Sequence, residues 1–405
     1  MQTFRYYLFF LLLITLIVPT KAQSNWKTIV TNGIDSLLAN HPVMEHASCG
    51  ILVYDATDDI ILYQHDQKKT HRPASTTKTF TCAAVLKYLT SDYSFRTSVY
   101  TTGKIKRKRI NNKKMRILQG DIFVKGSLDP AFSSADMDTL MMILQANNID
   151  SITGNLYADL SMKDRKLGGS GWCWDDTGDD FPLLHPLLLD KDTTFMSEFY
   201  ARLNAAGIGV GGYIKDSICP ANKRLLAEKC RSLSELLPQC LKTSDNRYAE
   251  AFLYQLGTMS GEPFPSTDIS MNYVNSMIDS LGCPKEEYHF VDGSGLSFYN
   301  YVTPEIEVAL LKYIYQLSDF FEEFKNALPI SGIDGTLENR MRGTAAEGKV
   351  FAKTGTLSGT NTLAGYAYSQ NGHMLIFSIM NDGVTTGNSN AARKLQDEIL
   401  DLLCK

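Results

Sequence analysis

The chain has 405 residues, of which 44% are hydrophobic and 21% charged, and its formal net charge is −4. This composition is that of a globular protein with enough apolar residues for two or three cores, and it excludes a disordered or fibrous chain. The mild acidity argues against a nucleic-acid-binding protein, which would present a basic surface. The eight cysteines form no C-x-x-C pair, so we expect structural disulfides or buried thiols, no metal site and no cofactor.

The N-terminus has the features of an export signal. Arg5 precedes an almost wholly apolar run at 6–18, and small residues end at Ala22. We predict a signal peptide over residues 1–22 and an exported, periplasmic or cell-envelope protein. The apolar run of about 13 residues is short against the roughly 20 that a spanning helix needs, so we expect no integral membrane segment after signal removal. An uncleaved anchor is the alternative.

The segment after the signal predicts the start of a sheet followed by a helix. Residues 29–38 have helical periodicity, and residues 49–54 and 60–63 alternate as two strands of a hairpin. A further helix is predicted over 75–88, with Ser75 at its N-terminus. A candidate nucleophile therefore stands at a helix end.

Residues 94–221 change to short strands separated by turn residues, which predicts an inserted domain. The later part returns to longer elements. The predicted elements are strands at 117–125, 152–160 and 207–215, helices at 233–240, 246–257 and 303–317, strands at 349–354, 362–369 and 373–380, and a helix at 390–403. We therefore expect residues 24–93 and 222–405 to form one sheet covered by helices, split by the insertion at 94–221. The chemistry is expected where these chain segments meet.

A basic run lies in the inserted part. Its cations are Lys104, Lys106, Arg107, Lys108, Arg109, Lys113, Lys114 and Arg116. We interpret the run as the solvated face of a hairpin that turns at Asn111 and Asn112. A grip on an anionic envelope polymer is the alternative function that the sequence leaves open.

Three short motifs occur in the order S-x-x-K, S-D-N and K-T-G. They are Ser75-Thr76-Thr77-Lys78, Ser244-Asp245-Asn246 and Lys353-Thr354-Gly355. Each motif is short enough to occur by chance, but their order and their predicted structural context together indicate a nucleophilic serine enzyme. Because residues three apart on a helix share a face, Ser75 is expected beside Lys78.

The motif side chains suit acyl transfer. A serine hydroxyl is a poor nucleophile unless a base takes its proton, and Lys78 is the expected base for Ser75. The charge of Lys353 would help to keep Lys78 neutral. Ser244 would relay the proton to the leaving amine, and Asn246 would orient Lys78 and the substrate amide.

The residues around the third motif are expected to bind the substrate. The backbone N–H groups of Ser75 and Thr356 would stabilise the oxyanion. Thr354, beside Gly355, would bind the terminal carboxylate. The structural alternatives are a helix N-cap for Ser75 and a strand-edge charge for Lys353.

These motifs resemble the peptidase S13 family, the penicillin-binding protein 4 type of D-alanyl-D-alanine carboxypeptidase/endopeptidase. Longer similar stretches lie at residues 72–75, 126–130, 171–174, 291–297 and 328–340. The resemblance implies an α/β (α+β) chain with a serine β-lactamase/DD-peptidase-like transpeptidase fold and a β-rich domain inserted between the first two motifs. It implies cleavage of peptidoglycan stem peptides and cross-links through an acyl-enzyme on Ser75, and binding of β-lactam antibiotics.

The resemblance also assigns two residues outside the motifs. Asp159 matches an inserted-domain aspartate that reaches the active site and meets the amino group of a diamino acid. Arg340 matches an arginine at the cleft edge. A turn-capping aspartate and a surface arginine are the structural alternatives. The separation of Ser75 and Ser244, 169 positions, is shorter than in three-domain members, which implies that the family's third domain is absent.

The sequence argues against three other functions. A serine β-lactamase usually has a deacylating glutamate in an E-x-x-L-N context after the second motif, and the sequence has no such context there, although Glu286 and Glu287 are present. A generic esterase would need a G-x-S-x-G elbow, which is absent. The intact motifs argue against a non-catalytic peptidoglycan-binding relative.

Overall fold

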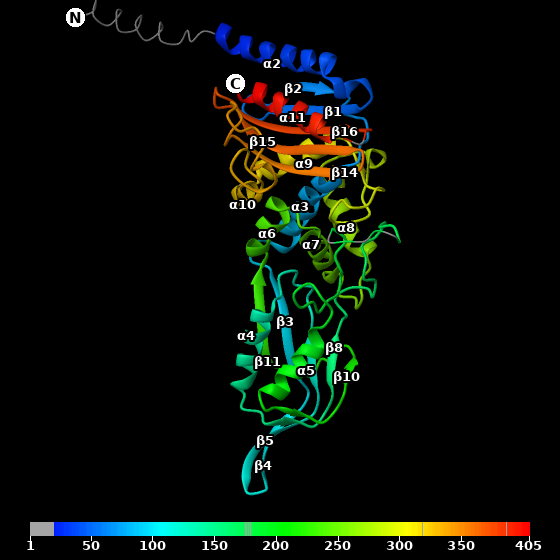
Figure 1. Ribbon diagram of the computed structural model, residues 1–405, viewed down its shortest axis with the longest axis vertical. Coiled ribbons are helices and arrows are strands. Elements are labelled where there is room, and N and C mark those ends of the chain that lie inside the picture. The colour runs from blue at the N-terminus through cyan, green and yellow to red at the C-terminus, as the bar shows by residue number, and fades with distance from the viewer. Residues whose placement is uncertain (1–19, 175, 177, 179, 318, 386) are drawn as a thin grey trace, which may run out of the picture.

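The computed structural model describes residues 20–174, 176, 178, 180–317, 319–385 and 387–405. Most of the predicted signal peptide, residues 1–19, lies outside the described residues. Figure 1 shows an elongated molecule in which a sheet with its helices occupies one end, a second sheet lies below it, and a hairpin extends from the opposite end. Among the described helices, none has the length and apolar content that crossing a membrane requires.

The first sheet joins distant parts of the chain. Its order is β14-β15-β16-β1-β2, with antiparallel neighbours throughout. The strands are β1 Ser48–Asp55, β2 Ile60–His65, β14 Val350–Leu357, β15 Thr360–Tyr368 and β16 Met374–Asp382. The central strands β15 and β16 are buried almost throughout, because helices cover both faces of the sheet.

Helices α2 and α11 cover one face through residues such as Ile34 and Leu395, while α3, α7 and α9 build the larger core on the other side. The α-helices of this part are α2 Thr20–Asn40, α3 Thr77–Leu89, α6 Leu233–Lys242, α7 Asn246–Thr258, α8 Thr267–Asp279, α9 Pro304–Gln316, α10 Phe321–Ala327 and α11 Ser389–Cys404. The shorter elements are 3-10 turns η1 Pro42–Glu45, η2 Ala74–Thr76, η3 Lys285–Glu287 and η4 Gly335–Leu337, and strands β12 Tyr288–His289 and β13 Tyr301–Val302.

The second sheet has the order β10-β8-β6-β3-β11, with β8 parallel to both β6 and β10. Its strands are β3 Ser94–Thr101, β6 Ile122–Lys125, β8 Leu156–Asp159, β10 Ile214–Asp216 and β11 Arg224–Ser232, and helices α4 Ser134–Gln145 and α5 Phe195–Ala205 share its core. A smaller sheet of order β4-β5-β7-β9 lies beside it. Its strands are β4 Lys104–Ile110, β5 Lys113–Gln119, β7 Ser151–Ile152 and β9 Gly209–Val210.

The predicted domain boundary between residues 221 and 222 is too early. Strand β11 pairs with β3 as far as Ser232↔Ser94, so this part of the chain still belongs to the second sheet. The strand was missed because the adjacent buried residues Leu226 and Ala227 and four interspersed charged residues interrupt the alternation that marks a half-buried strand.

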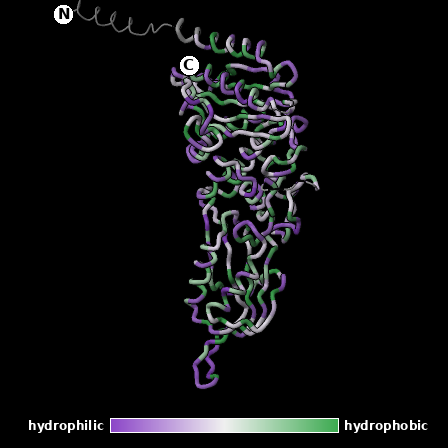
Figure 2. The backbone as a smooth tube through the Cα atoms, viewed as in Figure 1, coloured by the Kyte–Doolittle hydropathy of each residue, from purple (hydrophilic) through white to green (hydrophobic). Residues whose placement is uncertain are grey.

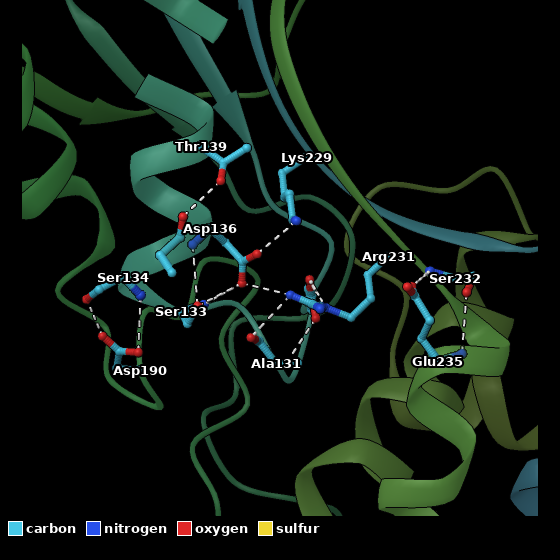
Figure 3. Close-up of polar contacts among 12 residues, drawn as sticks. Ala131, Ser133, Ser134, Asp136, Thr139, Asp190, Lys229, Arg231, Ser232 and Glu235 are labelled. Carbon is cyan, nitrogen blue, oxygen red and sulfur yellow. Dashed lines mark hydrogen bonds and ion pairs between the residues drawn. The ribbon is translucent and has the colours of Figure 1, made fainter. Parts of the chain in front are cut away.

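The chain passes from β11 straight into α6, and a charged cluster fixes this joint (Figure 3). Arg231 donates from Nη2 to Asp136 at 2.7 Å and from Nε to Asp129 at 3.3 Å. Lys229 lies 3.0 Å from the other oxygen of Asp136. Because Asp136 stands in the first turn of α4, the cluster ties β11 to α4 beside the start of α6.

Candidate active site

Ser75 lies in turn η2, directly before α3, and neighbouring segments press on this turn. Ala74 has φ +49°, a left-handed conformation that a non-glycine residue adopts only where its surroundings impose it. A Cβ on Gly295 would lie 1.8 Å from the carbonyl oxygen of Ala74, and a Cβ on Gly355 would lie 2.6 Å from that of Pro73. Gly355 therefore allows β14 to pack on the nucleophile's turn, and it is not among the residues that line the cleft described below.

Lys78 is fully buried below the nucleophile. Its Nζ donates to Ser75 Oγ at 3.0 Å, to Asn246 Oδ1 at 2.7 Å and to the carbonyl oxygen of Ser294 at 2.7 Å. Burial lowers the pKa of Lys78 from its ordinary 10.5, which favours the neutral amine. A neutral amine has two hydrogens, which the two carbonyl-type acceptors can take, so its lone pair is left to face the Ser75 hydroxyl.

Lys353 is a second fully buried lysine. Its Nζ donates to Ser244 Oγ at 2.8 Å and to the carbonyl oxygen of Thr354 at 2.8 Å. Burial lowers the pKa of Lys353 well below 10.5, and the charge of Lys78 lowers it further. Ser244 has φ +63°, so this motif residue is held in a strained conformation, as Ala74 is beside the nucleophile. The charge of Lys78 thus opposes protonation of Lys353, and each lysine lies beside a serine hydroxyl.

Asn246 begins α7 and is held at both ends of its amide. Its Oδ1 faces Lys78, as predicted, while its Nδ2 donates to the backbone oxygen of Asp180 at 2.8 Å. The sequence assigned this amide to the substrate as well. One N–H of the amide is instead bonded to the backbone of Asp180, a residue that no sequence pattern had linked to the site.

Two buried carboxylates hold the loop that supplies the Ser294 carbonyl. Glu250 accepts hydrogen bonds from the backbone of Gly293 at 3.0 Å and of Ser294 at 2.8 Å, and Asp292 accepts one from Gly295 at 2.9 Å. Burial, with the charge of Asp292, raises the pKa of Glu250 to about 8. Sequence reasoning noted this loop as a similar stretch and gave it no role, because a backbone acceptor has no residue signature.

A cleft of about 730 Å³ opens over these groups. Five predicted site residues line it, namely Ser75, Ser244, Asn246, Thr354 and Thr356. Another cleft, of about 600 Å³, lies between α7 and the second sheet and contains none of the three motifs. The first cleft is therefore the candidate active site. Thr336 also lines it, and its Oγ1 accepts a hydrogen bond of 2.7 Å from Thr354.

The expectation that Asp159 reaches the cleft is wrong. Asp159 ends β8 and is buried, with one oxygen 3.0 Å from the backbone N–H of Ser161 and the other 2.9 Å from that of Cys219. It does not line the cleft. The carboxylate caps a turn in the second sheet, which was the structural alternative.

Arg340 is also absent from the cleft lining. Its guanidinium donates twice to one oxygen of Asp397 on α11, at 2.6 and 2.9 Å, and so fixes that helix. Another arginine, Arg393, contacts the cleft wall, and its Nη2 donates to Thr356 Oγ1 at 3.3 Å. Sequence reasoning missed Arg393 because it belongs to the C-terminal helix, far from any motif.

A serine beside a buried lysine, with two further motifs converging on it at the edge of an antiparallel sheet, defines an active-site-serine acyl-transfer enzyme of the DD-peptidase type. The model of the D-Ala-D-Ala carboxypeptidase 3 (S13) family matches residues 30–186 and 187–403. The chain belongs to that family and is a serine-type D-Ala-D-Ala carboxypeptidase, so the resemblance stated from the motifs is confirmed.

Known relatives agree over most of the chain. It is 27% identical to the D-alanyl-D-alanine carboxypeptidase of Actinomadura sp. (strain R39), over 88% of this chain and 81% of that protein. It is 22% identical to D-alanyl-D-alanine carboxypeptidase DacB of Haemophilus influenzae, over 95% of this chain and 94% of that protein.

The predicted fold class is confirmed by solved structures. The crystal structure of penicillin binding protein 4 (DacB) from Haemophilus influenzae superimposes with a TM-score of 0.79 at 22% identity, over 90% of this chain and 97% of that one. A crystal structure of the same protein complexed with a β-lactam has a TM-score of 0.74 at 22% identity, over 91% of this chain and 98% of that one.

Proposed function

We propose that Ser75 forms the acyl-enzyme through which this chain cleaves the terminal D-Ala-D-Ala bond of peptidoglycan stem peptides, and the related bond of cross-links. The observation that carries the proposal is the position of Lys78, whose Nζ is 3.0 Å from Ser75 Oγ while two carbonyl-type acceptors hold its remaining hydrogens. This arrangement suits a neutral amine that receives the serine proton.

The chemistry follows from the arrangement. Ser75 Oγ attacks the carbonyl carbon of the penultimate D-alanine as its proton passes to Lys78, and the oxyanion forms in reach of the backbone N–H groups of Ser75 and Thr356. The C–N bond then breaks as Ser244 delivers its proton to the leaving amine, and Lys353, whose Nζ donates to Ser244, replaces that proton. Water finally attacks the ester and loses a proton through Ser244 to Lys353, while Lys78 returns its proton to Ser75, which restores the hydroxyl and releases the shortened peptide.

The far end of the substrate carries a carboxylate in the carboxypeptidase reaction. The hydroxyls of Thr354 and Thr336 lie together at the cleft, and Arg393 contacts Thr356 on the same wall. These groups suit a terminal carboxylate, and a β-lactam presents a comparable carboxylate beside its reactive carbonyl. We propose that β-lactams acylate Ser75 in the same way.

Hydrolysis of β-lactams is the second candidate function. Rapid deacylation needs an acid placed to activate water. Among the described residues that line the cleft, the only acid is Asp180, whose backbone oxygen holds Asn246. Glu250 and Glu307 are buried below the cleft and engaged in hydrogen bonds. This supports a peptidase over a β-lactamase.

We also propose that the protein is exported, as its substrate and N-terminal sequence require, and that it lacks the family's third domain. The second proposal is supported by the segment between β8 and α5, where the described residues include no helix or longer strand, only the isolated bridge Leu189↔Asp192.

Fluorescent penicillin tests the assignment directly. We expect the wild type to be labelled covalently, with the adduct on the peptide containing Ser75, and Ser75→Ala to remain unlabelled. Because burial lowers the pKa of Lys78, the labelling rate is expected to rise with pH and to level off below pH 10.5. Incubation with an acyl-D-Ala-D-Ala peptide and with purified cross-linked fragments then separates carboxypeptidase from endopeptidase activity. An adduct on another residue would refute the proposal.

A further inference from the structure

The hairpin β4–β5 extends from the end of the molecule opposite the first sheet (Figure 1). Its strands pair from Lys104↔Gln119 to Ile110↔Lys113, and Asn111 and Asn112 turn the chain with φ of +47° and +65°. Figure 2 colours this tip as hydrophilic. Within β5, only Ile117 and Leu118 pair with β7. Among the described residues, 106–116 therefore form a two-stranded ribbon with no third strand beside it.

The ribbon concentrates positive charge. Residues 104–116 contain eight cations and no acid, and without them the formal charge of the chain would be −12 instead of −4. All of the cations are exposed except Arg116, which is half-buried. Across the part of the chain that the structure describes, none of the eight side chains forms an ion pair. The side chains of these cations therefore have no ion-pair partner among the described residues, although the Asp150 carboxylate accepts a hydrogen bond from the backbone N–H of Arg116.

The strand register places all three arginines on one face of the ribbon. Arg107 lies opposite Arg116, and Arg109 opposite Lys114, so these four share one face of the ribbon. The other face carries Lys104, Lys106, Lys108 and Lys113. Like charges directly opposite each other destabilise a strand pair, and an isolated two-stranded ribbon is marginal in water. The arrangement costs stability, and a surrounding anion would remove that cost.

Cations on both faces indicate the kind of partner. A ribbon that inserted into a membrane interface would need an apolar side or tip, whereas this tip reads Ile110-Asn111-Asn112-Lys113 and only Ile110 is a large exposed apolar residue. A polymer network that surrounds the ribbon can contact both faces. Arginine's planar fork suits bidentate contact with carboxylates, which the stem peptides of peptidoglycan carry at their ends.

We propose that the β4–β5 ribbon is a second binding site for peptidoglycan, which holds the carboxylates of the substrate polymer at a distance from the catalytic cleft. The inference rests on the proposed function for the identity of the polymer. No residue of the ribbon lines the cleft. The ribbon therefore acts on polymer binding and leaves cleavage of small substrates unchanged.

Co-sedimentation with insoluble peptidoglycan tests this inference, using full-length protein whose cleft has been blocked with penicillin. We expect the wild type to bind in a salt-sensitive manner, and a triple variant with Arg107→Gln, Arg109→Gln and Arg116→Gln to bind about tenfold more weakly, as expected for the loss of three ion pairs at or near the surface. The matched control carries Lys68→Gln, Lys285→Gln and Lys394→Gln, which remove the same charge at exposed sites elsewhere and should bind as the wild type does.

Hydrolysis of a soluble acyl-D-Ala-D-Ala peptide separates the two proposals. Equal hydrolysis by wild type and ribbon variant, with weaker polymer binding by the variant alone, supports the inference. If the wild type hydrolyses no peptide, the proposed function fails, whatever the sedimentation shows. Equal polymer binding by both proteins overturns the ribbon's role. Binding to phosphatidylglycerol vesicles or duplex DNA that exceeds binding to peptidoglycan also overturns it, and assigns the ribbon to those partners instead.

Discussion

Lys78 and Lys353 are fully buried and donate to named partners at 3.0 Å or less, whereas the lysines of the β4–β5 ribbon are exposed and form no ion pair among the described residues. In both regions cationic groups affect one another, since the charge of Lys78 lowers the pKa of Lys353 and like charges face each other across the ribbon. Below the cleft, each lysine lies beside a serine hydroxyl that takes part in the proposed chemistry. In the ribbon, the charges face solvent and one another.

The dielectric constant around the charges determines how strongly they interact in each region. Two unit charges 4 Å apart interact by about 1 kcal/mol in water and by about 4 kcal/mol at the effective dielectric constant of a protein surface, and burial strengthens the effect. Burial below the cleft can therefore change the protonation state of Lys78, as general-base chemistry requires, and burial together with the charge of Lys78 can change that of Lys353. Repulsion in the solvated ribbon only weakens the strand pair, and its lysines remain charged and available to a partner.

The largest expected effect comes from removing a cleft lysine. Lys78→Ala eliminates the proposed base, and we expect penicillin acylation to slow by about 10² to 10⁴-fold, the usual contribution of a positioned general base. Stopped-flow labelling measures the rate, and circular dichroism checks the fold. Lys87→Ala, on the same helix but bonded to Ser280, is the matched control and should acylate normally. A near wild-type rate for Lys78→Ala would remove the lysine from this role.

A buried acid behind the nucleophile should make stability depend on pH. Glu307 accepts hydrogen bonds from Thr76 and Ser378, and burial raises its pKa from 4.5 to about 7. The folded state keeps this proton until about pH 7 while the unfolded chain releases it near 4.5, so the free energy of unfolding falls as pH rises through that window. At roughly 1.4 kcal/mol per pH unit, the decrease is about 3 kcal/mol.

Glu307→Gln has no proton to lose, so its stability relative to the wild type should rise by about 3 kcal/mol between pH 4.5 and 7. Denaturant unfolding at several pH values measures the difference. Glu322→Gln, at an exposed helix position, should show no such trend. A constant difference between Glu307→Gln and the wild type would mean that Glu307 is ionised throughout.

Replacing Asp159 tests whether this buried carboxylate of the second sheet stabilises the fold or recognises substrate. In Asp159→Asn, the amide NH₂ must face one of the two backbone N–H groups that now bind the carboxylate, so we expect a loss of about 1–3 kcal/mol in unfolding free energy. Activity on stem peptides with and without a free amine at the third residue should change equally. A selective loss on the diamino peptide would return Asp159 to substrate recognition.

The smallest effect is expected in the ribbon itself. Arg109→Glu places a carboxylate directly opposite Lys114 and should stabilise the strand pair by about 0.2–1 kcal/mol. Hydrogen exchange of the ribbon amides reports this local change as slower exchange. Lys108→Glu makes the same charge change opposite Met115, and should slow exchange less. Equal protection in both variants would show that cross-strand repulsion does not limit the ribbon's stability.

The sequence predicted the elements whose pattern is local. The three final strands, predicted at 349–354, 362–369 and 373–380, correspond to β14, β15 and β16, and Ser75 stands directly before α3 as expected. The convergence of the three motifs was predictable because each motif is recognisable from its own residues. Helices α4, α5, α8 and α10 and strand β11 were not predicted, the strand because its apolar and charged residues do not alternate.

The remaining site residues depend on contacts between distant segments. Lys78 is held by a backbone oxygen of Ser294, and Asn246 by that of Asp180, and any residue type can supply such an acceptor. Asp159 and Arg340 were assigned to the site by resemblance. In the structure, Asp159 binds the backbone of Ser161, and Arg340 binds Asp397 of helix α11. Residue identity alone does not say which way a charged side chain points.

The pairing of β1 with β16 also has a consequence for the time course of synthesis. Strand β1 ends at Asp55, and the strand beside it is not complete until Asp382, so at about 5–20 residues per second a nascent chain waits roughly 15 to 65 s for its neighbour. Lys353 is likewise made long after Ser75. The newly made chain therefore lacks Lys353 and three strands of its first sheet until synthesis is nearly finished, and hydrolase activity is expected only after those residues have been made.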